Sequence, residues 1–373
     1  MDGSIPPSRA HGGHAGVTDQ GDDDPAATRA QDDPAATRGL PVTLRTIAEH
    51  AGVHTSTVSR ALRQPDRADP TARRIQSIAA ELGYRPDLAA ASLRTRRSGT
   101  IGMLVHRLTD VVQAILFEAV EHTALELGYQ AIVANTYDAV AEQYRRAELM
   151  LARRVDGLVL ADAHLTPGYI AWVHERGVPF VLVNRRTGDY PSVTLDDYLA
   201  GQLAGSHLAG LDHTVVAVLA GLAHSSASSE RASGCLDASR ERGVQIEDDL
   251  VEGTRLDASS GRAAMRRILA RRPDVTAVFA VNDFDALGAV IALREAGREP
   301  GRDVAVVGCN DVPVAEAAQL TTIRSPHTTM GATATRLLMD VIDQGRVESV
   351  RLSPELVVRA TSCPPPERHE HRT

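Results

Sequence analysis

Two kinds of hydrophobic pattern divide the chain. Between residues 43 and 83, apolar residues recur at three- and four-residue spacing, which is typical of short amphipathic helices. From about residue 100 onwards, short runs that are apolar throughout alternate with amphipathic stretches. A strand that is apolar at every position has both faces covered, as in a parallel sheet wound with helices. We therefore predict an α/β fold, with an all-α N-terminal part followed by a doubly wound parallel sheet.

Three short helices are predicted in the N-terminal part. The first covers residues 43–50 and is followed by a turn at Gly52, and the second covers residues 55–62. The third covers residues 69–83, because an Asp N-cap followed by Pro is a strong start signal for a helix. The first two helices and the Gly turn between them have the form of a helix-turn-helix unit, which reads DNA.

The apolar runs predict seven strands in two lobes. The first lobe covers roughly residues 100–195, and the second begins near Val215. In such a fold, ligands bind at the carboxyl ends of the strands, here between the two lobes. The predicted strands are Ile101–Val105, Ala131–Ala134, Gly157–Ala161, Pro179–Val183, Val215–Leu219, Ala277–Val281 and Val304–Gly308.

The charge distribution supports a DNA-binding N-terminal part. The whole chain carries a formal charge of −8, but residues 41–98 contain 10 Arg against five acidic residues, a net charge of +5. A local concentration of basic charge is the electrostatic footprint expected of a nucleic-acid binder. The acidic remainder of the chain is expected to avoid DNA.

Composition narrows the cellular setting. Residues 1–40 are polar and rich in Gly, Pro, Asp and Ala, so we expect them, like the tail 363–373, to be disordered. The N-terminus lacks the basic and apolar regions of a signal peptide, and no apolar run approaches the ~18 residues that a membrane helix needs. The three cysteines are isolated, which fits a reducing compartment. These features predict a cytoplasmic protein without membrane contact.

Enzyme motifs are missing from the sequence. It contains no Gly-x-Gly-x-x-Gly, phosphate loop, Gly-x-Ser-x-Gly elbow or His-Glu-x-x-His. The tail segment His369-Glu370-His371 can contact a metal, but beside three prolines at a terminus it fits a solvated segment better. We therefore expect no catalytic activity, cofactor or metal.

Residues 42–93 resemble the headpiece of the lactose-repressor/galactose-repressor (LacI/GalR) family of bacterial transcription factors. The likeness continues to residue 362 through motifs that occur in the family's order. It implies a helix-turn-helix headpiece over 41–85, a hinge helix and linker over 86–98, and a two-lobed, periplasmic-binding-protein-like effector-binding and dimerisation domain over 99–362. As in sugar-binding proteins of this architecture, we expect a return to the first lobe after Thr321–Ile323, within the motif Leu320–Ile323. The remaining motifs are Arg154–Leu158, Gly177–Pro179, Val193–Asp197, Ser229–Gly234, Val281–Asp283, Ala286–Ala289 and Val306–Asp311.

The resemblance places DNA-reading residues on the second helix. Thr55 and Ser56 occupy the two main specificity positions, and Arg60, one turn later, can donate two bonds to a guanine. His54 replaces the Ser that usually starts this helix, which weakens the expected cap. The alternative is an amphipathic helical hairpin without a role in DNA binding, whose hydroxyl groups simply face solvent. Phosphate contacts are expected from Thr43, Thr46, Thr57 and Ser59.

Leu93 resembles the apolar wedge of the family's hinge helix. That helix is too short to be stable alone, but paired with its dimer mate on DNA it can press the leucine into the minor groove. The neighbouring residues Arg94, Arg96 and Arg97 favour this role over that of a plain linker.

Effector-binding residues are expected directly after the strands. Arg231 matches the family arginine that bonds ligand hydroxyls, and its planar fork suits paired oxygens. Asn310 stands where many relatives have Asp, and Leu256 lies near the position of a common aromatic, so a ligand other than a simple neutral hexose is indicated. Asn282 can instead cap the next helix, and His106 and His327 can be ordinary packing residues. The candidates are His106, Asp162, Asn184, Arg231, Asn282, Asn310 and His327.

Together these features predict a homodimeric repressor of carbohydrate-utilisation genes. It would bind a palindromic operator in double-stranded DNA, with an affinity controlled by a sugar-like effector. The alternatives are a regulator that needs a corepressor, such as a nucleobase or a partner protein, and a solute-binding protein. A sugar-processing enzyme is a weaker alternative, because the sequence lacks a catalytic constellation.

Overall fold

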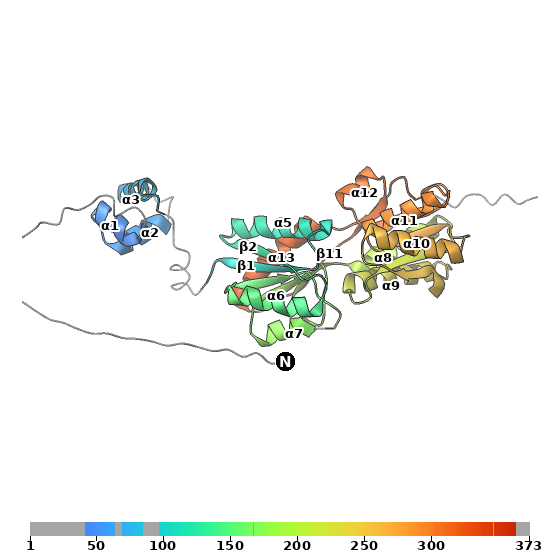
Figure 1. The fold of residues 1–373 in the computed structure, drawn as a ribbon, viewed down its shortest axis with the longest axis horizontal. Helices are drawn as coiled ribbons and strands as arrows, with labels where there is room; N and C mark the ends of the chain where they lie inside the picture. The colour runs from blue at the N-terminus through green and yellow to red at the C-terminus, as the bar shows by residue number, and fades with distance from the viewer. Residues whose placement is uncertain (1–41, 64–68, 85–96, 167, 346, 363–373) are drawn as a thin grey trace, which may run out of the picture. The chain divides into compact units, whose positions relative to one another are not determined.

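The computed structural model describes residues 42–63, 69–84, 97–166, 168–345 and 347–362. They form two separate compact units, a small one before residue 87 and a large one after it (Figure 1). Within the described ranges, no helix combines the length and apolar character that crossing a bilayer requires.

The small unit consists of three helices, α1 (Leu44–Ala51), α2 (Thr55–Arg63) and α3 (Pro70–Glu81). A capping box between Thr43 and Thr46 starts α1, and Gly52 ends it in the left-handed conformation, with a φ of 61°. Ile47, Val58 and Ile75, one from each helix, are at most 1% exposed and form the centre of the core. The three predicted helices are confirmed, although α3 ends at Glu81, two residues before the predicted Gly83.

The large unit contains two six-stranded sheets, one in each lobe (Figure 1). The first has the order β11-β5-β4-β3-β1-β2 and is parallel throughout. The second has the order β12-β10-β9-β8-β6-β7, in which only β12 is antiparallel. The predicted doubly wound fold is confirmed. The strands are β1 (Thr100–Val105), β2 (Gln130–Asn135), β3 (Gly157–Leu160), β4 (Phe180–Val183), β5 (Ser192–Leu195), β6 (Val216–Gly221), β7 (Val251–Gly253), β8 (Ala277–Ala280), β9 (Ala305–Asn310), β10 (Thr321–Arg324), β11 (Val350–Leu352) and β12 (Glu355–Val357).

The chain passes between the lobes three times. It enters the second lobe after β5, and after β10 it returns to the first, where α13 (His327–Gln344) packs against α5 (Val111–Glu126). This is the return expected after residues 321–323. The sequence did not predict the last passage, in which β12 rejoins the second sheet, because a three-residue edge strand leaves almost no hydrophobic signal.

Helices cover both sheets. In two pairs of helices, glycines allow the two backbones to come into close contact. A Cβ at Gly201 of α8 (Asp197–Gly210) would overlap the backbone oxygen of Arg231 in α9 (Ser226–Glu241). In the same way, Gly261 and Gly288 bring α10 (Ala258–Arg271) against α11 (Asp283–Glu295). The remaining helices are α6 (Val140–Ala152), α7 (Gly168–Glu175), α12 (Pro313–Ala317) and the 3₁₀ turn η1 (Asp248–Leu250).

The start of the large unit is fixed to the first lobe by one carboxylate. Asp156, at the start of β3, accepts the backbone N–H groups of Ser98 and Gly99 at 2.7 and 2.8 Å. Charge-assisted bonds of this kind are among the stronger hydrogen bonds in proteins. The chain that leads towards the small unit is therefore anchored in the first lobe.

Candidate nucleic-acid interface and ligand cleft

Helix α2 presents a polar face to solvent. Val58 and Ala61 point into the core of the small unit, whereas Ser56 and Arg60 are exposed. Residues four apart lie above one another on a helix, so Ser56 and Arg60 share this outer face. Thr55, Thr57 and Ser59 are half-buried beside it. The face carries hydrogen-bonding groups of the kind that read base edges.

His54 performs a capping role at the start of α2. The backbone N–H of Ser56 donates to Nδ1 of His54 at 3.3 Å, and the Ser56 hydroxyl lies 2.9 Å from the same nitrogen. The imidazole thus takes the position of the Ser that is usual in the resembled family, and it orients the Ser56 side chain.

Two of the residues predicted to contact phosphates, Thr43 and Thr46, already have partners within the small unit. The hydroxyls of Thr43 and Thr46 lie 3.0 Å apart within the capping box, so both already serve the start of α1. Leu93 lies outside the described residues.

A cavity of 330 Å³ lies between the two lobes of the large unit. Its volume is in the range of small-molecule sites. His106 and Asp138 line it from the first lobe, and Leu256 and Phe284 line it from the second. The other lining residues are Arg107, Thr109, Asp110, Tyr137, Leu222, His224, Arg255, Asp257 and Ala258.

A second, smaller hollow shares His106, Asp110 and Leu256 with this cavity and is also lined by Arg231 and Asn310. Arg231 is 5% exposed, and its Nε donates to Asp197 at 2.8 Å. Its Nη1 donates to the side-chain oxygen of Asn310 at 3.0 Å and to the Val281 carbonyl at 2.9 Å. Burial raises the pKa of Asp197 to about 6, although Arg231 opposes the rise. These contacts fix the guanidinium at the wall of the hollow.

The asparagines predicted as effector residues also line this hollow. Asn282 caps α11 by accepting the Phe284 N–H at 2.7 Å, so the capping alternative holds at the same time. Asn184 and Asn310 both have a positive φ, 65° and 119°. An asparagine tolerates such a backbone better than most residues, which fits its presence at these strand ends.

Asp162 and His327 line neither cavity. Asp162 is fully buried and accepts hydrogen bonds from the hydroxyls of Thr136 and Tyr169, so it serves the interior of the first lobe instead of the predicted effector contact. His327, the first residue of α13, is 5% exposed, and burial lowers its pKa to about 3. A neutral packing histidine, the alternative raised from the sequence, describes it better.

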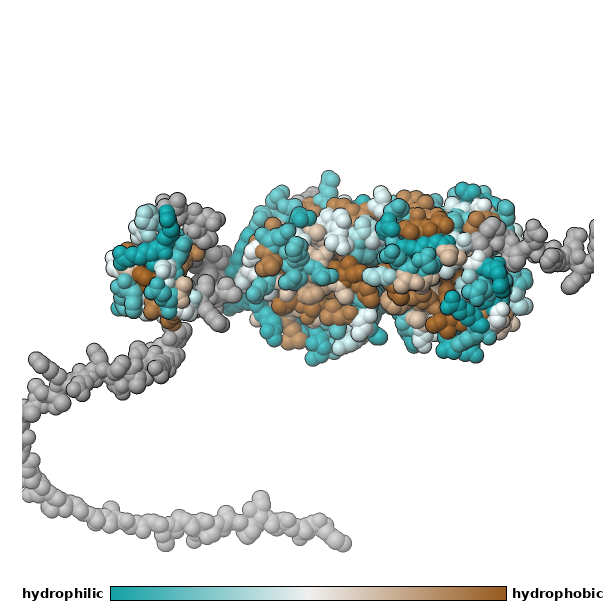
Figure 2. All heavy atoms as spheres, turned by 90° about the horizontal axis from the view of Figure 1, so that it is seen from above, coloured by the Kyte–Doolittle hydropathy of each residue, from teal (hydrophilic) through white to brown (hydrophobic). Residues whose placement is uncertain are grey.

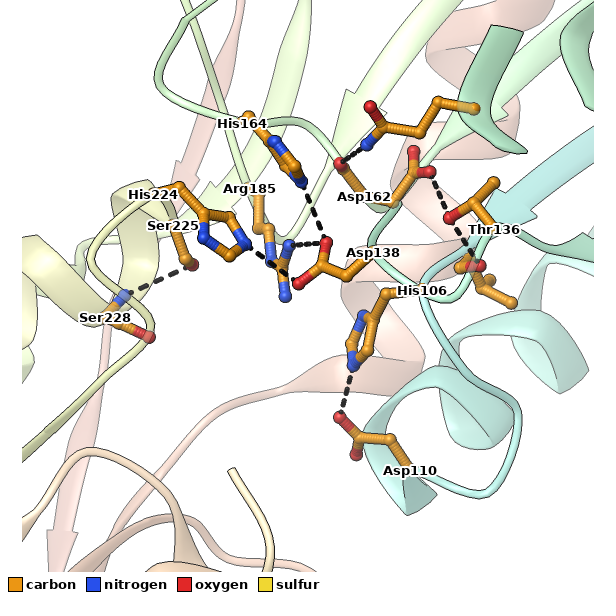
Figure 3. A network of polar contacts seen from close by, with 12 residues as sticks. His106, Asp110, Thr136, Asp138, Asp162, His164, Arg185, His224, Ser225 and Ser228 are labelled. Carbon is orange, nitrogen blue, oxygen red and sulfur yellow. Dashed lines mark hydrogen bonds and ion pairs between the residues drawn. The ribbon is translucent and has the colours of Figure 1, made fainter. Parts of the chain in front are cut away.

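Sequence reasoning missed a polar cluster around Asp138 (Figure 3). Asp138 accepts from Nη1 of Arg185 at 2.9 Å and lies 3.0 and 2.9 Å from Nε2 of His164 and His224. Burial alone raises the pKa of Asp138, but the bonds from His164 and Arg185 outweigh it and hold the pKa well below its usual range. Asp138, His164 and His224 lie in loops three or more positions after strand ends and Arg185 lies two after β4, so the search for residues directly after strands did not reach them.

We predict that the buried carboxyl group of Asp283, at the start of α11, makes the free energy of unfolding depend on pH. It accepts from the Val312 N–H at 2.9 Å and the Thr322 hydroxyl at 2.6 Å, and burial raises its pKa to about 7. The unfolded chain loses this proton near pH 4 and the folded chain only near pH 7, so stability falls as pH rises between them, by about 1.4 kcal/mol for each pH unit. Asp283→Asn should flatten the decline in urea-unfolding free energy between pH 5 and 8. An unchanged slope in the variant would refute this assignment.

The chain matches two families over most of its length. Residues 43–87 match the bacterial regulatory proteins of the lacI family. Residues 98–358 match the periplasmic binding proteins and sugar binding domain of the LacI family. Both matches agree with the order of the two structural units.

Known proteins show the same relationship. The transcriptional repressor PurR of Erwinia tasmaniensis is 31% identical over 88% of this chain and 99% of its own length. A transcriptional regulator CelR–cellobiose complex is 32% identical, with a TM-score of 0.67, over 86% of this chain and 99% of that one. The lac repressor dimer bound to operator and the anti-inducer ONPF is 27% identical, with a TM-score of 0.78, over 87% and 100%. This chain therefore belongs to the LacI family of bacterial transcriptional regulators.

Proposed function

We propose that this regulator represses carbohydrate-utilisation genes and that a sugar-like effector controls its affinity for operator DNA. The effector would bind in the cleft between the lobes, which consists of the cavity and the adjoining hollow. The observation that carries the proposal is the combination, in one chain, of a solvent-facing polar helix bearing Arg60 with a buried polar cleft around Arg231. The first suits base recognition and the second suits a hydroxylated small molecule. A catalytic role has no support in the relatives, which are named as regulators.

The cleft chemistry favours a ligand rich in oxygen atoms. Arg231 donates, and Asn184, Asn282 and Asn310 each offer both a donor and an acceptor group. The solved CelR complex contains cellobiose, which supports a sugar-like effector here. Tyr137 and Phe284 line the larger cavity, so it contains aromatic side chains although Leu256 is not one.

The effector would act by changing how the lobes close. Residues from both lobes line the cleft, so a ligand that contacts both favours one lobe arrangement over another. The linker towards the headpiece is anchored in the first lobe through Asp156. Movement of that lobe would then alter the fit of Leu93 and the headpiece to DNA, with a typical coupling of about 1–3 kcal/mol.

A homodimer would bind a palindromic operator. The solved lac repressor relative is a dimer on its operator. Figure 2 shows apolar surface on both lobes of the large unit. A two-fold dimer buries the same patch of both copies, and its two headpieces match two half-sites. Over the large unit as a whole, the exposed large apolar side chains include Leu125, Leu127, Tyr198, Leu199 and Ile291.

Arg60 tests the proposed DNA-reading face. Arg60→Ala should weaken operator binding by about 1–3 kcal/mol, roughly 5- to 150-fold in Kd, and relax the preference at one base pair. The side chain is exposed, so folding should be unaffected. Fluorescence anisotropy with the operator and its single-base variants measures both effects. Arg294→Ala, which removes another exposed charge, from α11 of the large unit, should leave binding unchanged. An unaltered base preference in Arg60→Ala would refute the role.

The proposed function as a whole is tested by finding the operator and the effector. Selection from random palindromic DNA, together with the DNA upstream of the chain's own gene, should yield a site bound by the full protein. A panel of sugars, sugar acids and nucleobases should then change its affinity. A response to a nucleobase alone would support the corepressor alternative, and failure to bind any DNA would contradict the proposal.

A further inference from the structure

Two imidazoles and a carboxylate converge beside the cleft (Figure 3). Nε2 of His164 lies 3.0 Å from Oδ1 of Asp138, and Nε2 of His224 lies 2.9 Å from Oδ2. One ligating atom of each residue lies within 4.8 Å of the other two. Asp138 and His164 belong to the first lobe and His224 to the second, so the cluster joins the lobes.

We propose that Asp138, His164 and His224 form a binding site for a divalent transition metal such as Zn²⁺, which ties the two lobes together. Imidazole nitrogen and carboxylate oxygen are ligands that Zn²⁺ and its neighbours accept readily. Bonds of about 2.1 Å in a tetrahedral arrangement place ligand atoms roughly 3.4 Å apart. At present Nε2 of His164 lies 3.0 Å from Oδ1 of Asp138, Nε2 of His224 lies 2.9 Å from Oδ2, and the three ligand atoms lie within 4.8 Å of one another, so binding requires the side chains to rearrange around the ion.

The loops that carry the ligands are held together without a metal. The Leu165 N–H donates to the carbonyl of His224 at 2.8 Å, directly across the lobe boundary. The Thr187 hydroxyl donates to the Leu165 carbonyl at 2.8 Å, and the rings of His164 and His224 lie 4.2 Å apart, centroid to centroid. The ligand set is therefore largely preorganised, which reduces the entropy cost of binding.

Arg185 is the main opposing feature. Its guanidinium is 1% exposed and bonds Oδ1 of Asp138, so it repels a second cation and lowers the affinity of the site. A carboxylate has about four lone-pair directions on two oxygens, so the Arg185 bond and a metal bond can coexist. Such a bond also orients the carboxylate, as outer partners of metal ligands usually do. The cavity wall carries Asp110 and Asp257 together with Arg107 and Arg255, so these residues add no net negative charge to offset Arg185.

Three protein ligands leave one coordination position open. Asp138 and His224 both line the 330 Å³ cavity, so a water molecule or an oxygen of a bound small molecule can take that position. The metal would then strengthen lobe closure and connect it to occupancy of the cleft. This second step rests on the proposed function, whereas metal binding itself does not.

Titration of the full-length protein with Co²⁺ tests the site, because tetrahedral Co²⁺ absorbs visibly. The parent should carry His369→Ala and His371→Ala, which removes the histidines of the C-terminal segment. We expect one Co²⁺ per chain with this absorption, and at least about a tenfold loss of affinity in His224→Ala. His122→Ala, which removes a 74% exposed histidine of α5, should bind as the parent does.

Thermal unfolding with Zn²⁺ alone gives a second readout. Zn²⁺ should raise the Tm of the parent and of His122→Ala, but not that of His224→Ala or Asp138→Asn. The His224 side chain is 40% exposed, so its replacement by Ala should leave the fold intact. Equal Co²⁺ affinity in the parent and in His224→Ala, or no tetrahedral Co²⁺ signal in the parent, would overturn the proposal. The cluster would then be a hydrogen-bonded contact between the lobes. Loss of DNA binding has no bearing on either readout.

Discussion

Arg231→Met should destabilise the large unit by about 3–5 kcal/mol at pH 8, because it leaves Asp197 as a buried carboxylate without its cation. Burial raises the pKa of Asp197 to about 6 even with Arg231 beside it, and loss of Arg231 raises it further, so at pH 5 the acid is neutral and the loss should shrink. Urea unfolding at pH 5 and pH 8 measures the difference. The variant should also lose effector binding, because Arg231 lines the hollow beside the main cavity.

Two further variants separate stability from ligand binding. Adding Asp197→Asn to Arg231→Met removes the stranded carboxylate and should restore most of the stability, while the effector response stays lost. Arg240→Met on the same helix breaks only an exposed pair with Asp237 and should cost less than about 1 kcal/mol. An effector response that survives in the stable double variant would show that Arg231 does not bind the ligand.

Gly201→Ala should disrupt the contact between α8 and α9. The added Cβ would overlap the backbone oxygen of Arg231, and backbone on both sides leaves no flexible side chain to move away. Overpacking typically costs about 1–3 kcal/mol, and a clash between two helix backbones should reach or exceed the upper end. The shift of α9 should also displace Arg231 and weaken effector binding. Urea unfolding and ligand titration measure the two effects.

Gly210→Ala is the matched control for this prediction. Gly210 lies at the end of the same helix, and a Cβ there would have no heavy atom within 4 Å. Replacing a helical glycine by alanine gains roughly 0.5–1 kcal/mol when nothing clashes. Equal stability changes in the two variants would contradict the close packing of α8 on α9.

Local signals predicted the fold well where they were strong. Asp69 followed by Pro set the start of α3, and runs such as Val304–Gly308 identified strands covered on both faces. Short edge strands such as β12 were not predicted, because three residues of mixed burial carry no period. The glycine contacts between helices were also missed, since a glycine at a helix–helix contact looks the same in sequence as one at a free surface such as Gly210.

The family likeness and the strand ends pointed to only part of the residues around the cleft. The likeness pointed to Arg231 and the strand ends to Asn310, and the structure brings the two within 3.0 Å of each other across 79 positions. Neither gave a guide to His164 and His224, which meet only because loops of two different lobes face each other. Asp162 follows a strand as an effector residue should, but its side chain turns into the core. The end of a predicted strand shows that the next residue lies at the edge of the sheet, but it does not show in which direction the side chain of that residue points.

Operator binding measured with and without a ligand of the cleft tests the central claim most directly. Fluorescence anisotropy of the selected palindrome should show two chains bound per site. Its Kd should change by about 5- to 150-fold on addition of a molecule that binds the cleft. The double variant Arg231→Met/Asp197→Asn should bind the same DNA without responding to that molecule. An operator affinity that stays constant while the cleft is saturated would contradict control of the headpiece by the cleft.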